Sequence, residues 1–519
     1  MPPHSGSTSA YCATGCQTRY GTCNGPTTTT TKPPTPSTTP SSTLADCLAA
    51  KKVPVRFAAA ADFSALSKPY NLRLPYTPAV VVVPTTTTHV SDSVGCAGKS
   101  KVKVQAKSGG HSYASYSSGG RDGAMVIDLQ GFQSITLDAA TQVVKVGGGV
   151  RLGNLARAIY DQGKRALPHG TCPGVGIGGH ATHGGFGYSS RAWGLTLDAI
   201  VGLDVVLANG SVVHASSTAY PDIYFALRGA ADSFGVVTTF YLKTQAAPGT
   251  VINFSFSLAD MFTSASKLTS TVSHVQAFAQ NASVVDKNLG LGMYLDGTGF
   301  SISGTYFGSL TTFNEKIKPE LLRTLPTPSS SSVKPQGWID SLTALAGGTP
   351  LKQTLTGYNL HDTFFAKSVV VPRSTPLTTA ALDNYFNYII SSKGKAQSWF
   401  SIFNLYGGPG SQINVPAVSS SAYSDRSALW VVQHYGFTGT TGSAFPPATT
   451  EFVTGLNTAL ESKMPNTVFG GYLNYVDPSL SAAQAHKEYY ADATYQRLLA
   501  IKKAVDPAAV FWNPQAVGV

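Results

Sequence analysis

A run of glycines at residues 168–187 constrains the fold more than any other part of the chain. The segment PHGTCPGVGIGGHATHGGFG holds eight glycines in twenty residues. Glycine inside a helix or strand costs roughly 0.5 to 1 kcal/mol per residue, so we expect neither element here. A flexible low-complexity loop is one interpretation. Val175, Ile177 and Phe186 are spaced through the run. These apolar residues favour a second interpretation, a buried segment that wraps around a bound group.

A shorter glycine turn precedes this run and has the form of an anion cradle. A predicted strand at residues 102–106 leads into KSGGHSY at residues 107–113. Two adjacent glycines let the backbone point successive N–H groups at one concave spot, which is how phosphate is held. The two glycine segments together predict a bound dinucleotide.

Length, charge and hydropathy narrow the class of protein. A chain of 519 residues suggests two or three structural units of about 100 to 200 residues each. The net charge is +11, but lysine and arginine are scattered and form no basic block interleaved with aromatics, so we expect no nucleic-acid partner. The apolar run at residues 79–83 ends at Pro84, and none reaches the roughly 18 residues that span a bilayer, so we expect no membrane insertion.

The six cysteines divide into two groups of three. Between the groups lies a Thr/Pro/Ser-rich tract at residues 27–43, with the composition of an extended, O-glycosylated spacer. After the spacer, Cys47 and Cys96 are the natural disulfide pair in an oxidising compartment, which leaves Cys172 unpaired.

The N-terminal ten residues lack the charged and apolar segments of a signal peptide, so they do not by themselves predict export. The spacer and three possible N-glycan acceptors, Asn209, Asn253 and Asn281, favour a secreted, extracellular protein.

The main chain predicts an α+β fold in several parts. Residues 44–247 contain short β-branched strands, glycine turns and a helix near 152–162. Residues 248–470 alternate helices, near 257–280 and 375–391, with aromatic strands such as 398–405 and 427–435, whose side chains alternate in direction. Residues 471–519 begin with a predicted strand and continue into a helix near 481–505.

An ordered set of strings resembles one family, the berberine bridge enzyme type of FAD-linked oxidases in the vanillyl-alcohol oxidase superfamily. The strings are SGGHSY, GTCPGVGIGGH, SRAWGLTLD, LRGAADSFGVVT, YLNYVDP, YYADATYQRL and IKKAVDP, and the resemblance runs from residue 47 to the end. It is strongest to fungal gluco- and chito-oligosaccharide oxidases. The resemblance implies a two-part FAD-binding domain at 44–247, a substrate domain at 248–470 with an antiparallel sheet covered by helices, and a C-terminal segment at 471–519 that returns to the FAD domain.

A second, much shorter resemblance concerns the N-terminus. Residues 11–23 resemble the tail of a hevein-like chitin-binding module, in which Cys16 would pair with Cys23 and the partner of Cys12 would be missing. That family needs more cysteines and an aromatic face, so we interpret residues 1–26 as a truncated remnant.

The resemblance implies FAD bonded at two points, with His111 on the flavin 8α-methyl and Cys172 on flavin C6. Val175 stands where oxidases of the family carry a small residue, which favours oxygen as electron acceptor. His180 and His183 are expected to be structural or to lie near the pyrophosphate rather than to bind a metal, since no Cys or Glu completes a zinc-like set. The further cofactor-binding residues we expect are Ser108, Gly109, Gly110, Ser112, Gly176, Gly178, Gly179, His180 and Val237.

An oxidase that takes hydride from an alcohol also needs a base for the hydroxyl proton. The resemblance assigns that role to Tyr475, although a core tyrosine is the structural alternative. Asn404 stands where carbohydrate oxidases of the family commonly have Asp. It can donate a hydrogen bond to a phenolate but cannot accept its proton. The substrate residues we expect are Tyr113, Gln433, Trp430, Tyr435 and Trp399, although aromatic strand residues are more often plain core.

The resulting hypothesis is oxidation of the reducing-end C1 hydroxyl of cello-, xylo- or chito-oligosaccharides to lactones by a monomer, with oxygen reduced to hydrogen peroxide. One alternative is oxidation of a secondary metabolite on the same scaffold, which Asn404 keeps open. An alternative of another class is a chitin-binding protein with an inert flavin.

Overall fold

Short runs of β-branched residues form the first sheet of the protein. The structure is a computed structural model that describes residues 42–519 apart from 357–359, 397 and 440–443. All three valines of strand β2 are fully buried, because β-branched side chains pack well on a pleated core surface. β4 runs parallel to both of its neighbours. In sheet order the strands are β1 (Val55–Arg56), β2 (Val80–Val82), β4 (Met125–Asp128) and β3 (Val104–Lys107).

A second, antiparallel sheet of five strands follows. Helix α5 (Leu152–Gly163) buries Leu152, Leu155 and Ile159, at helical spacing, in the core of this sheet. This part of the chain therefore mixes helices and sheets, as predicted for an α+β fold. In sheet order the strands are β5 (Ile135–Asp138), β6 (Val143–Gly147), β10 (Val236–Lys243), β8 (Ile200–Val206) and β9 (Val212–Ala215).

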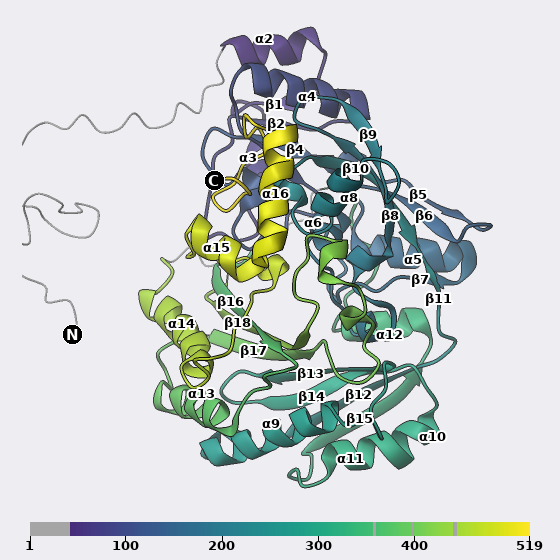
Figure 1. Cartoon of the computed structure of the whole chain (residues 1–519), viewed down its shortest axis with the longest axis vertical. Coiled ribbons are helices and arrows are strands. Elements are labelled where there is room, and N and C mark those ends of the chain that lie inside the picture. Colours follow the sequence, from purple (N-terminus) through teal and green to yellow (C-terminus); the bar gives the residue numbers. More distant parts are fainter. Residues whose placement is uncertain (1–41, 357–359, 397, 440–443) are drawn as a thin grey trace, which may run out of the picture. The chain divides into compact units, whose positions relative to one another are not determined.

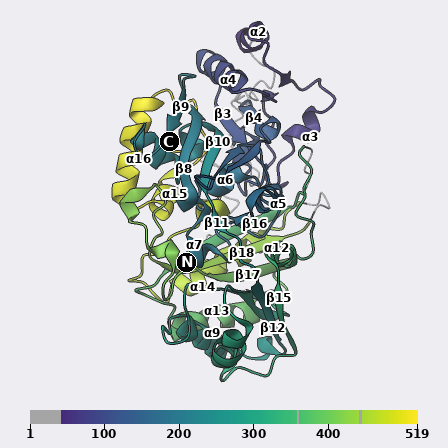
Figure 2. The ribbon, with the colours of Figure 1, turned by 90° about the vertical axis from the view of Figure 1, so that its right-hand side faces the viewer.

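The third sheet has seven strands, all antiparallel, and it supports the candidate site on one face. In Figures 1 and 2 it lies between the helices α9 and α13 and the strands β8 and β10. In sheet order the strands are β15 (Ser330–Gln336), β12 (Val251–Leu258), β14 (Phe300–Tyr306), β13 (Leu289–Leu295), β17 (Ser398–Leu405), β18 (Ala428–Phe437) and β16 (Phe364–Pro372).

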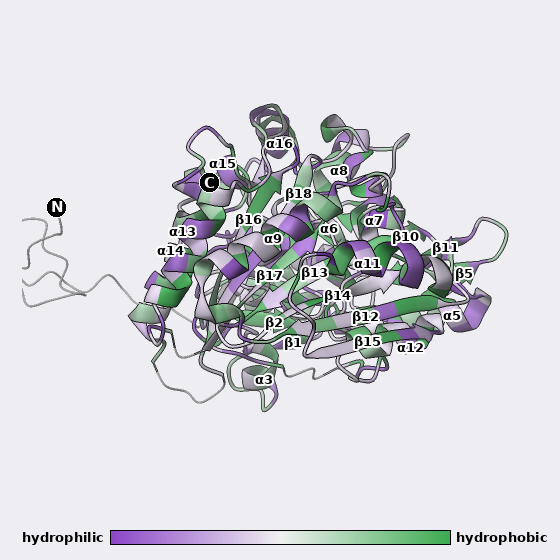
Figure 3. Cartoon of the chain, turned by 90° about the horizontal axis from the view of Figure 1, so that it is seen from below, coloured by the Kyte–Doolittle hydropathy of each residue, from purple (hydrophilic) through white to green (hydrophobic). Residues whose placement is uncertain are grey.

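Both faces of the seven-stranded sheet are buried, against different partners. Val432 packs into the core formed with the helices, whereas its neighbour Val431 packs into the core of the five-stranded sheet. The covering helices are amphipathic, and in Figure 3 hydrophilic and hydrophobic residues alternate along them. Their bounds are α9 (Ala265–Ala279), α13 (Thr379–Ser391) and α14 (Pro447–Glu461).

The C-terminal residues lie beside the first sheet, although most of the chain separates them in sequence. The Val104 N–H donates to Val510 O at 2.8 Å, and Gln105 Nε2 donates to Trp512 O at 2.9 Å. The single helix predicted for residues 481–505 is wrong, because the chain forms α15 (Ala482–Tyr489) and α16 (Asp492–Val505) with Tyr490 extended between them. The Tyr490 hydroxyl donates to Gly229 O at 3.2 Å, so a tertiary contact holds the break.

Other predicted elements also differ from the structure. The helix predicted near 257–280 begins only at Ala265, because strand β12 continues to Leu258. The expected strand after Gly471 is a 3-10 turn, η9 (Leu473–Tyr475). The glycine run that we expected to exclude a helix contains one, α6 (Ile177–Thr182). Ile177 is fully buried there, and a Cβ on Gly178 would lie 2.7 Å from Ser108 Cβ, so close packing outweighs the low helix propensity of glycine.

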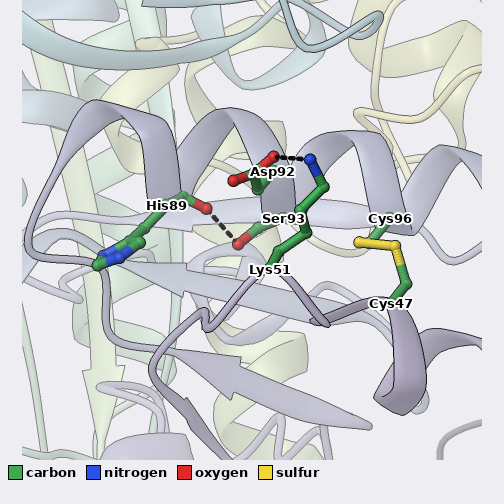
Figure 4. Close-up of a disulfide and its surroundings, with 6 residues drawn as sticks. All are labelled: Cys47, Lys51, His89, Asp92, Ser93 and Cys96. Atoms are coloured by element: carbon green, nitrogen blue, oxygen red, sulfur yellow. Dashed lines mark hydrogen bonds and ion pairs between the residues drawn. A yellow bond between two sulfur atoms is a disulfide. The ribbon is translucent and has the colours of Figure 1, made fainter. Parts of the chain in front are cut away.

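The predicted disulfide between Cys47 and Cys96 is present. It joins α2 (Ser42–Ala50) to α4 (Thr87–Lys99), with the two Cα atoms 5.7 Å apart (Figure 4). An ion pair of 3.2 Å between Lys51 and Asp92 joins the same two segments. The other N-terminal cysteines, the remnant and residues 27–41 of the spacer lie outside the described residues.

Within the described ranges, no helix combines the length and apolar character required to span a membrane.

Candidate active site

The two predicted glycine segments lie against each other. A Cβ on Gly176 would lie 2.0 Å from the backbone nitrogen of Gly109, so only glycine allows this approach. The Ser108 hydroxyl donates to Gly148 O at 2.6 Å and accepts from the Gly178 N–H at 3.1 Å. Three glycine segments distant in sequence thus converge at one place.

The remaining predicted cofactor residues lie around this junction. Gly110 has φ +76°, a left-handed conformation that suits glycine. The Ser112 hydroxyl accepts the Tyr116 N–H at 2.9 Å and closes the turn after His111. Val237 O would lie 2.5 Å from a Cβ on Gly148. Gly179 and His180 belong to helix α6.

His180 and His183 have structural partners on the protein. The imidazole Nε2 of His180 accepts the Gly170 N–H at 3.1 Å. Burial lowers the pKa of His180 to about 3, so the ring is neutral. His183 Nε2 lies 3.4 Å from Asp232, and although burial opposes the charged form, the carboxylate raises the pKa of His183. Among the described residues, no cluster of three His, Cys, Asp or Glu side chains has a metal-binding arrangement.

His111 and Cys172 share a neighbour, Tyr70. The His111 ring lies 4.5 Å from the ring of Tyr70, and the Cys172 thiol interacts electrostatically with the same tyrosine. Burial, with the charges of Arg151 and His361, lowers the pKa of His111 to about 3, so its imidazole is neutral. Cys172 is unpaired and solvent-accessible, yet the surrounding protein raises the pKa of its thiol.

This group of residues fits an attached flavin. A neutral imidazole is nucleophilic at its unprotonated nitrogen, and a thiol that loses its proton is a nucleophile, so each can bond to an electrophilic ring edge. The converging glycines Gly109 and Gly176 leave N–H groups close together without side chains between them, which suits a pyrophosphate. His111 and Cys172 would hold the ring, and the glycine segments would hold the phosphates.

Three tyrosine rings stack beside these residues. The ring of Tyr113 lies 6.2 Å from that of Tyr70 and 5.5 Å from that of Tyr475, and both pairs are stacked. Burial first, and then the nearby Tyr472 and Cys172, raise the pKa of Tyr475. No described residue forms a hydrogen bond with the Tyr475 hydroxyl, so it is available to another molecule.

Two predicted residues reach this region from the seven-stranded sheet. Gln433 Nε2 donates to the Tyr113 hydroxyl at 2.9 Å. Asn404, on the neighbouring strand, is 8% exposed, and its Oδ1 would lie 3.5 Å from a Cβ on Gly292. No hydrogen bond joins Asn404 to Tyr475 among the described residues, so the structure provides no direct contact for the expected support of a phenolate.

The prediction that Trp430 and Trp399 line the substrate pocket is wrong. Trp430 Nε1 donates to Gln276 of α9 at 3.2 Å, and the Trp399 ring lies 5.0 Å from Phe452 of α14. These contacts place both side chains on the helix-covered face of the sheet. Because side chains alternate along a strand, their immediate neighbours face the other side.

Tyr435 lies on the opposite face, towards the stacked tyrosines. Its ring stacks on Phe364 at 4.4 Å and on Phe400 at 4.9 Å, and its hydroxyl donates to Asp362 at 2.8 Å. We did not predict Tyr70, Phe400 or Asp362. Phe400 and Asn404 are an even number of residues apart on strand β17, so their side chains point to the same face. This spacing could have predicted that Phe400 lies on this face.

The comparisons with known proteins agree with this geometry. Residues 78–216 match a family model described as FAD binding domain, and residues 471–518 match one described as berberine and berberine like. The glycine cradle thus belongs to an FAD-dependent oxidoreductase.

The chain is 37% identical over 475 residues to the xylooligosaccharide oxidase of Thermothelomyces thermophilus, covering 91% of this chain and 93% of that protein. The chain belongs to the berberine bridge enzyme type of FAD-linked oxidases. It is also 34% identical to the chitooligosaccharide oxidase of Gibberella zeae, covering 91% and 93% of the two chains. A solved structure of glucooligosaccharide oxidase from Acremonium strictum, with a 6-S-cysteinyl, 8α-N1-histidyl FAD, superposes with a TM-score of 0.85 at 30% identity, covering 92% of this chain and 99% of that one.

Proposed function

We propose that this protein oxidises the reducing-end C1 hydroxyl of xylo-, cello- or chito-oligosaccharides to lactones, with FAD bonded to His111 and Cys172. The single observation that carries the proposal is the Tyr475 hydroxyl, which forms no hydrogen bond with any described residue and lies in the tyrosine stack beside Cys172. Carbohydrate oxidation is also the activity named for the similar proteins described above.

Tyr475 acts as the general base. It removes the proton of the C1 hydroxyl as the carbon gives up hydride. When bound, FAD would accept that hydride and pass the electron pair to oxygen, giving hydrogen peroxide. Because burial raises the pKa of Tyr475, the ionised tyrosine is a strong base that is present in a small fraction at neutral pH.

Residues around Tyr475 orient the sugar. Gln433 and Tyr113 are hydrogen-bonded to each other at 2.9 Å, so together they offer hydroxyl and amide groups in one orientation. Phe400, which is partly exposed and stacks on the buried Tyr435, offers an apolar surface to a pyranose. Asn404 donates to a sugar hydroxyl and does not take a proton.

Attachment at two points has a direct test. Acid-denatured protein should keep its yellow colour in the pellet. His111→Ala and Cys172→Ala should each retain flavin through the other bond, and the double variant should release it into the supernatant. Free flavin from the unaltered protein would disprove the covalent attachment.

The reaction is tested with a panel of oligosaccharides and with oxygen and a dye acceptor in parallel. We expect hydrogen peroxide and lactone to form in equal amounts. In Tyr475→Phe, kcat should fall by about 10²- to 10⁴-fold with flavin still attached. The exposed Tyr220 (54% exposed) provides the control Tyr220→Phe, which should keep full activity. If Tyr475→Phe retains kcat, the base is another group.

The pH profile gives an independent test of the base. A base must be deprotonated, and the pKa of Tyr475 is raised, so kcat/KM should increase with pH and reach no plateau below about pH 9. A plateau near neutral pH would contradict a tyrosine base.

Oxidation of a secondary metabolite is the second candidate, because Asn404 replaces the acid common in carbohydrate oxidases of the family. Turnover of aromatic alcohols or amines, with none of oligosaccharides, would favour it.

We also propose that the protein is a secreted monomer. The disulfide between Cys47 and Cys96 suits an oxidising compartment. The side chains of the predicted glycan acceptors Asn209 and Asn281 are exposed. The Asn253 side chain is instead hydrogen-bonded to Ser341, so Asn253 is a poorer glycan acceptor. Mass spectrometry of secreted protein before and after glycan removal tests this proposal.

A further inference from the structure

The oxygen of Tyr472 is a convergence point for hydrogen-bond donors. The backbone N–H groups of Gly185 and Phe186 each donate to it at 3.0 Å. Asn474 Nδ2 donates to the same oxygen, also at 3.0 Å. Tyr472 is 3% exposed, so water does not replace these donors. A phenol oxygen has two lone pairs, which these three N–H donors share, and the Tyr406 hydroxyl interacts with the same group.

These bonds connect two segments that meet at the site. Gly185 and Phe186 end the glycine run, whereas Tyr472 and Asn474 belong to the turn that contains Tyr475. Asn474 Nδ2 also lies 3.3 Å from His180 O and 3.2 Å from His183 O. The turn is thus bound to the glycine run by side chains at two of its positions.

The same tyrosine also fixes the turn to the seven-stranded sheet. The Tyr472 N–H donates to Ser368 Oγ of strand β16 at 2.9 Å, and the Tyr475 N–H donates to Tyr472 O at 2.7 Å. The two rings meet edge to face, with centroids 4.9 Å apart. Any shift of the Tyr472 ring therefore moves its contact with the Tyr475 ring.

We propose that Tyr472 is a positioning residue, whose oxygen clamps the glycine run to the turn and so aligns the Tyr475 hydroxyl with the substrate. The inference rests on the proposed function, in which Tyr475 is the base. Electrostatics agree with the geometry: burial raises the pKa of Tyr472, and the hydrogen bonds from Asn474, Phe186 and Gly185 oppose that rise. The three donors thus favour electron density on this oxygen.

The chain offers a matched control in Tyr423. Its ring is 1% exposed and packs edge to face against Tyr472, with centroids 6.5 Å apart. The Tyr423 hydroxyl has no hydrogen-bond partner among the described residues. Tyr423→Phe therefore removes the same atom from the same surroundings without breaking a hydrogen bond.

The test compares flavin-loaded Tyr472→Phe and Tyr423→Phe by steady-state kinetics and by amide hydrogen exchange. In Tyr472→Phe we expect kcat to fall about 10- to 100-fold, as for a misaligned base, with KM changed less than about twofold. The amides of Gly185 and Phe186 should exchange faster. Tyr423→Phe should match the unaltered protein in both measurements.

Several outcomes would overturn the inference. Unchanged exchange at Gly185 and Phe186 would mean that no clamp exists, and faster exchange with unchanged kcat would mean that the clamp does not align the base. If Tyr472→Phe does not fold, Asn474→Ala removes one donor of the clamp, and an unchanged kcat in that variant overturns the inference. Failure of the proposed function is separate, because it appears as retained kcat in Tyr475→Phe.

Discussion

A carboxyl group near the turn that holds Tyr475 should make stability depend on pH. Asp425 is partly buried, and its Oδ1 would lie 2.7 Å from a Cβ on Gly470. Burial, followed by the negative charge of Glu488, raises the pKa of Asp425 to about 8, although Arg426 opposes the rise. The folded protein therefore keeps a proton on this group that the unfolded chain releases near pH 4.

The sign follows from proton linkage. Between about pH 4 and pH 8 the folded state binds more protons than the unfolded state, so the free energy of unfolding decreases as pH rises. One group contributes at most about 1.4 kcal/mol per pH unit, or about 3 kcal/mol between pH 5 and pH 7. With an unfolding entropy of about 2 cal/mol/K per residue, a domain of about 480 residues would lose roughly 3 °C in Tm.

Asp425→Asn should remove this decrease, because the amide does not titrate. Calorimetric Tm values at pH 5, 6 and 7 measure it, and Asp161→Asn, at an exposed ion pair with Arg157, is the control. We expect the Tm of the control to fall with pH as in the unaltered protein, and that of Asp425→Asn to fall by about 3 °C less. Parallel curves for all three proteins would refute the reasoning.

Three further variants test packing and cross-linking. Gly176→Ala would place a Cβ 2.0 Å from a backbone nitrogen of the first glycine turn and should lower the ratio of flavin to protein absorbance, whereas Gly95→Ala, with no atom within 4 Å, should not. Arg191→Met removes a fully buried guanidinium that donates to four backbone carbonyls. In a denaturant titration it should lower the free energy of unfolding by about 3 kcal/mol or more, and a change below about 1 kcal/mol would contradict this. Replacing Cys47 and Cys96 by serine should lower stability by about 2 to 4 kcal/mol, and a Tm insensitive to this change would argue against a stabilising bridge.

Several parts of the site could be predicted because glycine and reactive side chains carry local information. The turn around Gly109 and the run around Gly176 were predicted to bind one dinucleotide, and the structure places the two segments in contact. Strand β17 (Ser398–Leu405) has the predicted bounds, because its aromatic residues suit a pleated surface. The roles of His111, Cys172 and Tyr475 stay predictions until the variants are measured.

Other parts could not be predicted from local pattern. Trp430 and Gln433 lie three residues apart on one strand and point to opposite faces, but an aromatic strand buried on both faces does not reveal which face meets the substrate. Helix α6 forms within a glycine run because Ile177 is buried there, which is a property of its neighbours.

Residue chemistry by itself determined that this chain is α+β and that its glycine segments suit a dinucleotide, because glycine turns and strand periodicity are properties of short segments. The resemblance of its motifs to the FAD-linked oxidases then identified the dinucleotide as FAD. Only the tertiary structure decided what surrounds the reacting groups. The tyrosine stack of Tyr70, Tyr113 and Tyr475 draws on three distant segments, and the hydrogen bonds to the Tyr472 oxygen join two. Such contacts depend on which sheet faces meet, and burial between those faces sets the pKa values on which the chemistry depends.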